Sequence, residues 1–87
     1  MVSAKVIVTN PMGLHMRPAQ LFVREMTAFD SDVLILYKDG SVNGKSIMNL
    51  IAACIKQGSE IVIQCMGSDE KEALQHAVSL IESGLGE

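Results

Sequence analysis

The fold is decided where an alternating run gives way to a helical pattern, in the stretch Asn10-Pro11-Met12-Gly13-Leu14-His15-Met16-Arg17-Pro18-Ala19. Upstream, residues 4–9 alternate in polarity, which is typical of a strand. Downstream, four apolar residues recur at helical spacing: Ala19, Phe22, Val23 and Met26. Pro18 fits the first helical turn, where no N–H donor is needed. We therefore predict a strand, a turn and a helix over residues 16–28.

The rest of the chain predicts three further strands and two further helices. The strands cover residues 33–37, 41–43 and 60–66, and the helices cover residues 47–54 and 70–83. Asp39-Gly40 is a hairpin signal, Ser46 is placed to cap the short helix, and Ser68 or Asp69 to cap the last one. The order is β-α-β-β-α-β-α. It predicts one α+β domain over residues 1–87, a four-stranded antiparallel sheet with three helices on one face.

Two details of packing also follow from the pattern. The short helix is expected to bury Ile47, Leu50, Ile51 and Cys54, and Gly84 to end the last helix. The uncovered face of the sheet is expected to carry a small apolar patch: Ile7, Leu34, Leu36 and Val62.

Composition limits the classes of function. A net charge of −3 argues against nucleic acid as a direct partner. Cys54 and Cys65 have no metal-ligand spacing and are expected to be buried thiols in a reducing compartment, without a metal site. The first nine residues lack a signal-peptide core, and no apolar run approaches a membrane span. We therefore expect a cytoplasmic protein without membrane insertion.

His15 is the first candidate for chemistry. It is predicted to lie at a helix start, where backbone N–H donors and the positive end of the helix dipole favour an anion. Gly13 permits an unusual backbone angle, and the Arg17 guanidinium suits phosphate oxygens. A phosphate carried on the imidazole would fit this setting. The competing interpretation is a histidine that only caps or packs at the helix start. No P-loop or acid–base pair indicates a self-contained catalyst.

Residues 13–19 resemble the active-site signature of the HPr family, the histidine-containing phosphocarriers of the bacterial sugar phosphotransferase system. The family usually has a small residue after the histidine, so Met16 is a departure. Lys45-Ser46-Ile47-Met48 resembles the regulatory phosphorylation segment of the branch found in low-GC Gram-positive bacteria.

The resemblance implies an HPr-like open-faced β-sandwich and a carrier, not an enzyme, that needs no cofactor. Phosphate from phosphoenolpyruvate would pass through Enzyme I to Nδ1 of His15 and then to the IIA domain of a sugar permease. Arg17 would neutralise the phosphate in transit.

The resemblance also implies a docking surface for these partners, which here maps to Met12, Met16, Gln20, Leu21, Arg24, Lys45, Ile47, Met48 and Ile51. Its basic members would meet acidic partner surfaces. Ile47, Met48 and Ile51 have a competing interpretation as core residues.

Ser46 has two interpretations as well. As an N-cap serine it needs no further role, whereas the resemblance implies regulation through phosphorylation by HPr kinase/phosphorylase and recognition by a catabolite control transcription factor. We expect the helix starts at His15 and Ser46 to share one docking face. Two alternatives remain: a regulatory-only HPr paralogue that acts as a transcriptional co-repressor partner, and a phosphocarrier of the nitrogen-regulatory branch.

Overall fold

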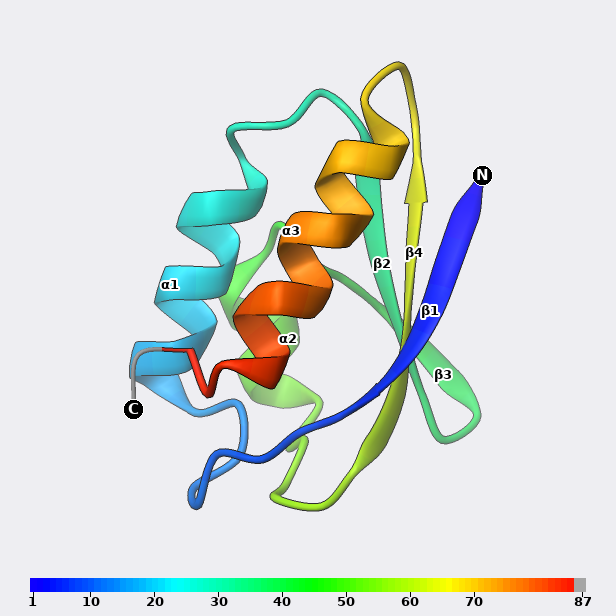
Figure 1. Ribbon diagram of the computed structural model, residues 1–87. Helices are drawn as coiled ribbons and strands as arrows, with labels where there is room; N and C mark the ends of the chain where they lie inside the picture. The colour runs from blue at the N-terminus through cyan, green and yellow to red at the C-terminus, as the bar shows by residue number, and fades with distance from the viewer. Residues whose placement is uncertain (86–87) are drawn as a thin grey trace.

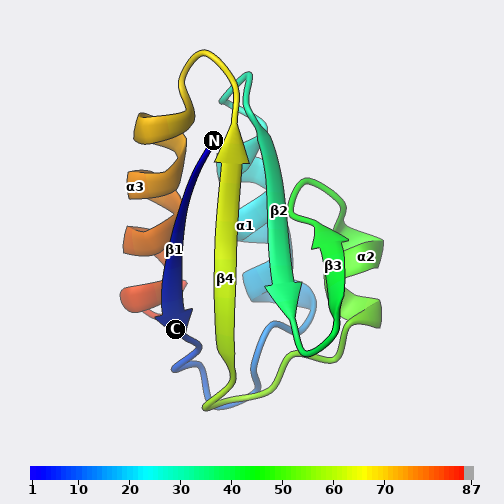
Figure 2. The same cartoon turned by 90° about the vertical axis from the view of Figure 1, so that its right-hand side faces the viewer.

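The computed structural model describes residues 1–85, in which four strands form one sheet and three helices cover one of its faces (Figures 1 and 2). The strands are β1 (Val2–Ile7), β2 (Asp32–Tyr37), β3 (Gly40–Asn43) and β4 (Glu60–Met66). The helices are α1 (Met16–Met26), α2 (Ile47–Ala52) and α3 (Glu70–Glu82). This confirms the predicted α+β class, the order of the elements and the placement of the helices.

The sheet is antiparallel throughout, in the strand order β1-β4-β2-β3. The last strand in sequence therefore lies between the first and second, as Figure 2 shows. Ile63 of β4 lies opposite Ala4 on one side and Ile35 on the other. Alternate residues of β4 point into the core, so Ile61, Ile63 and Cys65 are fully buried, as predicted.

The helices complete this core with their predicted apolar stripes. Phe22 and Met26 of α1 and Leu50 of α2 are fully buried. In α3 the fully buried positions are Ala73, Ala77 and Ile81, and α3 packs on β1 and β4. Each large aliphatic side chain removed from water contributes about 1.5–3 kcal/mol, so the core stabilises this arrangement without any tryptophan.

Several predicted boundaries are wrong by one or two residues. β1 covers 2–7 instead of 4–9, because Val8 already bonds to the loop before β4: its N–H donates to the Ser59 carbonyl at 2.9 Å. α1 ends at Met26. The hairpin turn consists of Lys38 and Asp39, not Asp39-Gly40, since Gly40 pairs with Tyr37 and the positive φ of +55° falls on Lys38.

The predicted burial of Cys54 is also wrong. α2 ends at Ala52, and Cys54 then adopts a left-handed conformation with φ of +54°, which turns the chain out of the helical stripe. The Cys54 side chain is consequently exposed, whereas Cys65 is buried as predicted.

The uncovered face of the sheet carries the predicted apolar residues in partly exposed positions. Ile7 and Leu34 are exposed, and Leu36 and Val62 are half-buried. Lys5 and Glu60, on neighbouring strands of the same face, form an ion pair at 3.7 Å.

At the start of α3, Asp69 occupies the predicted N-cap position but makes no side-chain cap to its own helix. Its carboxylate instead accepts hydrogen bonds from the backbone N–H groups of Asp30 (2.9 Å) and Ser31 (3.0 Å) and from the Ser31 hydroxyl. The Ser31 hydroxyl, together with the Asp30 and Ser31 N–H donors, lowers the pKa of Asp69 below its usual 3.8. The contact ties the loop after α1 to α3.

This contact makes stability depend on pH. A carboxyl with a lowered pKa in the folded state stabilises above its ordinary pKa, and the contribution is lost as the pH falls through the folded value. We expect Asp69→Asn to lower the free energy of unfolding at pH 7 and to flatten its decline below about pH 4. Urea denaturation at pH 7, 4, 3 and 2 measures this. Asp39→Asn, an exposed change in the hairpin turn, is the control, and an equal effect of both variants would contradict the assignment.

Candidate phosphorylation site

His15 lies at the N-cap of α1, half-buried, with an extended backbone (φ −84°, ψ −166°). Its carbonyl accepts the Ala19 N–H at 2.9 Å, the first bond of the helix. The first turn of α1 contains no acidic side chain, and Pro18 contributes no N–H. The N–H groups of Met16 and Arg17 and the positive helix end therefore lie beside the imidazole without a competing carboxylate on that turn.

The loop before His15 is fixed against the residues that follow α2. Asn10 to Gly13 form a turn in which the Gly13 N–H donates to the Asn10 carbonyl at 2.9 Å. The next residue, Leu14, is buried and donates its N–H to the Ile55 carbonyl, also at 2.9 Å. Gly13 has φ of +68°, and a Cβ there would lie 2.2 Å from the Ile55 oxygen. Glycine is therefore required at this position by both conformation and space.

Ser46 is the N-cap of α2, as predicted: its Oγ accepts from the Asn49 backbone N–H at 3.2 Å and from Nδ2 of Asn49 at 2.8 Å. The preceding Lys45 donates its Nζ to the Phe29 carbonyl at 2.7 Å, just beyond the end of α1. The two helix starts therefore do not adjoin, and the shared docking face stays a prediction. The start of α2 lies by the end of α1, and the residues after α2 lie by His15. The 11 residues of α1 separate the two ends by about 16 Å.

The predicted docking residues divide into two groups by exposure. Exposed at the surface are Met12, Met16, Gln20, Arg24 and Met48. Arg17, predicted to contact the phosphate, is exposed as well. Half-buried are Leu21, Lys45, Ile47 and Ile51. Met48 is 73% exposed, so its core interpretation is wrong, whereas Ile47 and Ile51 pack against the core with one side and leave the other accessible.

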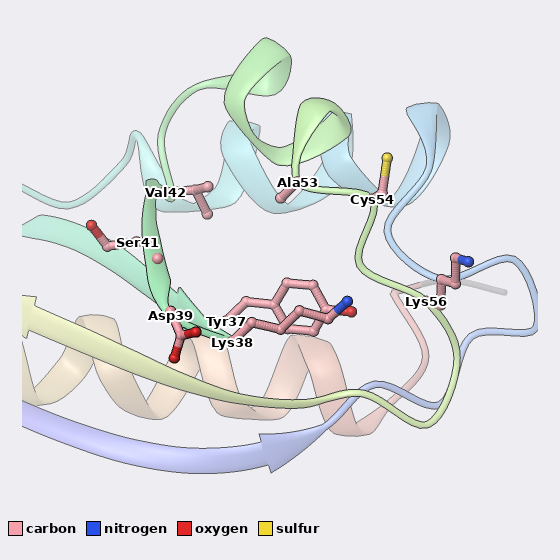
Figure 3. Close-up of a pocket in the computed structure, with 9 residues that line it drawn as sticks. Tyr37, Lys38, Asp39, Ser41, Val42, Ala53, Cys54 and Lys56 are labelled. Atoms are coloured by element: carbon pink, nitrogen blue, oxygen red, sulfur yellow. The ribbon is translucent and has the colours of Figure 1, made fainter.

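The segment that follows α2 is the part of the site that sequence reasoning missed. Beside it, a hollow of about 490 Å³ lies between the β2–β3 hairpin and residues 53–56 (Figure 3). Tyr37 and Lys38 lie side by side there, with the Lys38 ammonium 5.3 Å from the ring centre (Figure 3). Cys54 and Lys56 line the hollow from the other side. No side-chain pattern marks Ile55 as a neighbour of His15, because its contribution is a backbone carbonyl.

The comparisons with known proteins agree with this geometry. The profile of the family described as "PTS HPr component phosphorylation site" matches residues 2–83. The chain belongs to the HPr family. It is thus a phosphocarrier of the phosphotransferase system, whose partners are other proteins of that system, as its resemblance to the family implied.

Individual relatives cover nearly the whole chain. The phosphocarrier protein HPr of Buchnera aphidicola is 42% identical over 85 residues, which is 98% of this chain and 99% of that protein. The HPr-like protein Crh of Bacillus subtilis is 45% identical over 83 residues, 94% of this chain and 96% of Crh. The crystal structure of HPr-C-His from Thermoanaerobacter tengcongensis matches with a TM-score of 0.96 at 38% identity, covering 100% of this chain and 98% of that one.

In the part of the chain that the structure describes, no helix is long and apolar enough to span a bilayer.

The other histidine, His76, lies away from the site on α3, where its Nε2 is 2.9 Å from Oε1 of Glu25.

The close approach of Gly13 to Ile55 gives a matched pair of substitutions. Gly13→Ala adds backbone strain and a steric clash with the Ile55 carbonyl, whereas Gly58, with φ of +85°, has nothing within 4 Å of an added Cβ. We expect Gly58→Ala to cost about 1–2 kcal/mol of unfolding free energy from strain alone. Gly13→Ala should cost about 1–3 kcal/mol more. Urea denaturation measures both, and equal losses would show that the approach to Ile55 is not a constraint.

Proposed function

We propose that this chain is a single HPr domain that carries a phosphoryl group on Nδ1 of His15, taken from phospho-Enzyme I and passed to the IIA domains of sugar permeases. The observation that supports this most directly is the position of His15 at the start of an 11-residue helix whose first turn has no acidic residue. The protein acts as a carrier between two enzymes, without turnover of its own and without a cofactor.

Each transfer exchanges one bond to phosphorus for another. The lone pair of the neutral His15 Nδ1 attacks the phosphorus of phospho-Enzyme I, the N–P bond to His15 forms, and the bond from phosphorus to the donor group breaks, with its electron pair leaving on that group. The positive helix end and the first-turn N–H groups favour the added negative charge. Arg17, exposed on the same turn, supplies a forked pair of donors for the phosphate oxygens. The IIA acceptor then repeats the exchange, with His15 as the leaving group.

The exposed side chains around His15 suit short-lived docking. Met12 is 73% exposed and Met16 is 53% exposed, on either side of the histidine, and methionine adapts to more than one partner surface. Arg17 and Arg24 provide a basic rim for acidic partners despite the net negative charge of the chain. Met16, the departure from the usual small residue, adds contact area at the point where the partner's reactive group must approach.

A second candidate function is regulation through Ser46. Its Oγ is held at the helix start by Asn49, and Met48, on the first turn of α2, is 73% exposed. Crh, described as the catabolite repression HPr of Bacillus subtilis, is a relative that supports this candidate. Phosphorylation by HPr kinase/phosphorylase would add about 1.5–2 negative charges at the helix start, where the dipole tolerates them. A catabolite control transcription factor would bind this form.

The carrier function is tested by labelling. Incubation with Enzyme I and labelled phosphoenolpyruvate should give one acid-labile phosphate per chain, because N–P bonds hydrolyse in acid. His15→Ala should abolish the label and His76→Ala should keep it. A label that survives in His15→Ala, or no label on the wild type, would contradict the proposal. The chain would then be better interpreted as a regulatory-only HPr paralogue.

The regulatory role of Ser46 is tested by phosphorylating this residue and by placing a negative charge there through substitution. With HPr kinase and ATP, the wild type should gain an acid-stable phosphate that Ser46→Ala lacks. Ser46→Asp should slow the transfer from Enzyme I to His15 several-fold, whereas Ser41→Asp, which adds the same charge on β3, should not. Equal slowing by both variants would indicate a general effect of charge and would argue against a regulatory role.

A further inference from the structure

Asn10 is a buried polar residue that the proposed phosphoryl transfer does not use. Its side chain is 1% exposed, and Ser31 is the other fully buried polar residue among those that the structure describes. A polar side chain is costly to bury unless its hydrogen bonds are made inside the protein. The positions of these bonds therefore show what the side chain holds in place.

The Asn10 carboxamide connects the His15 loop to the end of α3. Its Nδ2 donates to the carbonyl of Gly84, 74 positions away in the sequence. That carbonyl is itself fixed, because Gly84 (φ of +83°) ends α3 in a Schellman turn: the Gly84 N–H donates to the Ile81 carbonyl at 3.2 Å and the Leu85 N–H to the Leu80 carbonyl at 3.0 Å. Leu85 is buried, which anchors the turn in the core.

The backbone of Asn10 connects this bond to the turn before His15. Its carbonyl accepts the Gly13 N–H and so closes the turn that ends two residues before the histidine. On the other side of the loop, Leu14 is bonded to Ile55. The loop is thus held both on the residues after α2 and on the last turn of α3. Loss of the bond to Gly84 removes the anchor on α3, so the turn before His15 can shift relative to that helix.

We propose that Asn10 is a positioning residue for the His15 ring, acting through its bond to the Gly84 carbonyl. The inference rests on the proposed function for its consequence, since a ring displaced by about 1 Å from the line of attack slows phosphoryl transfer. Asn10 does not touch the phosphate. It sets the orientation of the imidazole in the free protein, before any partner binds.

The experiment compares Asn10→Ala and Asn10→Asp with Ser31→Ala as a matched control. The aspartate keeps the shape of asparagine and removes its N–H donor. Ser31 is equally buried and also bonds a loop to α3, but at Asp69, at the opposite end of that 13-residue helix. The two ends are about 20 Å apart. All variants are measured at a temperature at which circular dichroism shows them fully folded.

Two readouts separate positioning from stability. In the first, NMR follows the ring resonances of His15 at one fixed pH without any phosphate donor. In the second, Enzyme I and phosphoenolpyruvate give kcat and KM with this protein as the varied substrate. Both Asn10 variants should shift the His15 ring resonances and lower kcat roughly 10- to 100-fold, with KM nearly unchanged because the docking residues remain in place. Ser31→Ala should move neither readout.

Several results would overturn the inference: unchanged His15 resonances in the Asn10 variants, a rise in KM alone, or equal changes in Ser31→Ala. The NMR readout needs no phosphate, so it judges the placement of the ring independently. If the wild type accepts no phosphate from Enzyme I, the proposed function fails, while shifted resonances in the Asn10 variants still support the positioning role.

Discussion

The site depends on one backbone contact, the approach of Gly13 and Leu14 to the carbonyl of Ile55. The Leu14 N–H bonds to this oxygen, and the absence of a side chain at Gly13 makes room for it. The contact joins the loop before α1 to the residues after α2. It fixes where α1 begins and therefore where the N–H groups of its first turn point. Without this contact, the loop that leads into His15 would lose its anchor on the residues after α2.

The sheet makes that contact possible through its strand order. β4 lies between β1 and β2, so the loops that follow β1 and precede β4 leave the same end of the sheet. Val8 bonds to Ser59 and Gly58 bonds back to Val8 at this end. The chain on either side of these bonds, residues 10–15 and 53–56, is thereby brought together. β1 and β4 are the first and last strands in the sequence, and the site forms only when they pair. A local segment of the chain therefore cannot form the site alone.

Sequence reasoning succeeded where a property repeats along the chain. The alternation in β4 and the stripe through Phe22 and Met26 predicted the elements and the core, because burial selects side chains at fixed periods. It failed where the backbone makes the contact or a single residue leaves the pattern. The positive φ of Cys54 ends α2 early, and the Ile55 carbonyl has no counterpart in side-chain chemistry. His15 and Ser46 could be located as helix starts, but their separation depends on how α1 and α2 pack.

That separation has a consequence for regulation. Ser46 lies by the end of α1 and His15 at its beginning, about 16 Å apart along the helix. At physiological ionic strength the Debye length is about 8 Å, so a phosphate on Ser46 is strongly screened from one on His15. Direct repulsion between the two phosphates therefore cannot be the main effect of phosphorylation at Ser46. A partner that covers the exposed faces of both helices, from Met16 to Met48, would meet the new charge directly within a desolvated contact. If Ser46 is phosphorylated as proposed, we therefore expect the added charge to act on docking, before the chemistry at His15 begins.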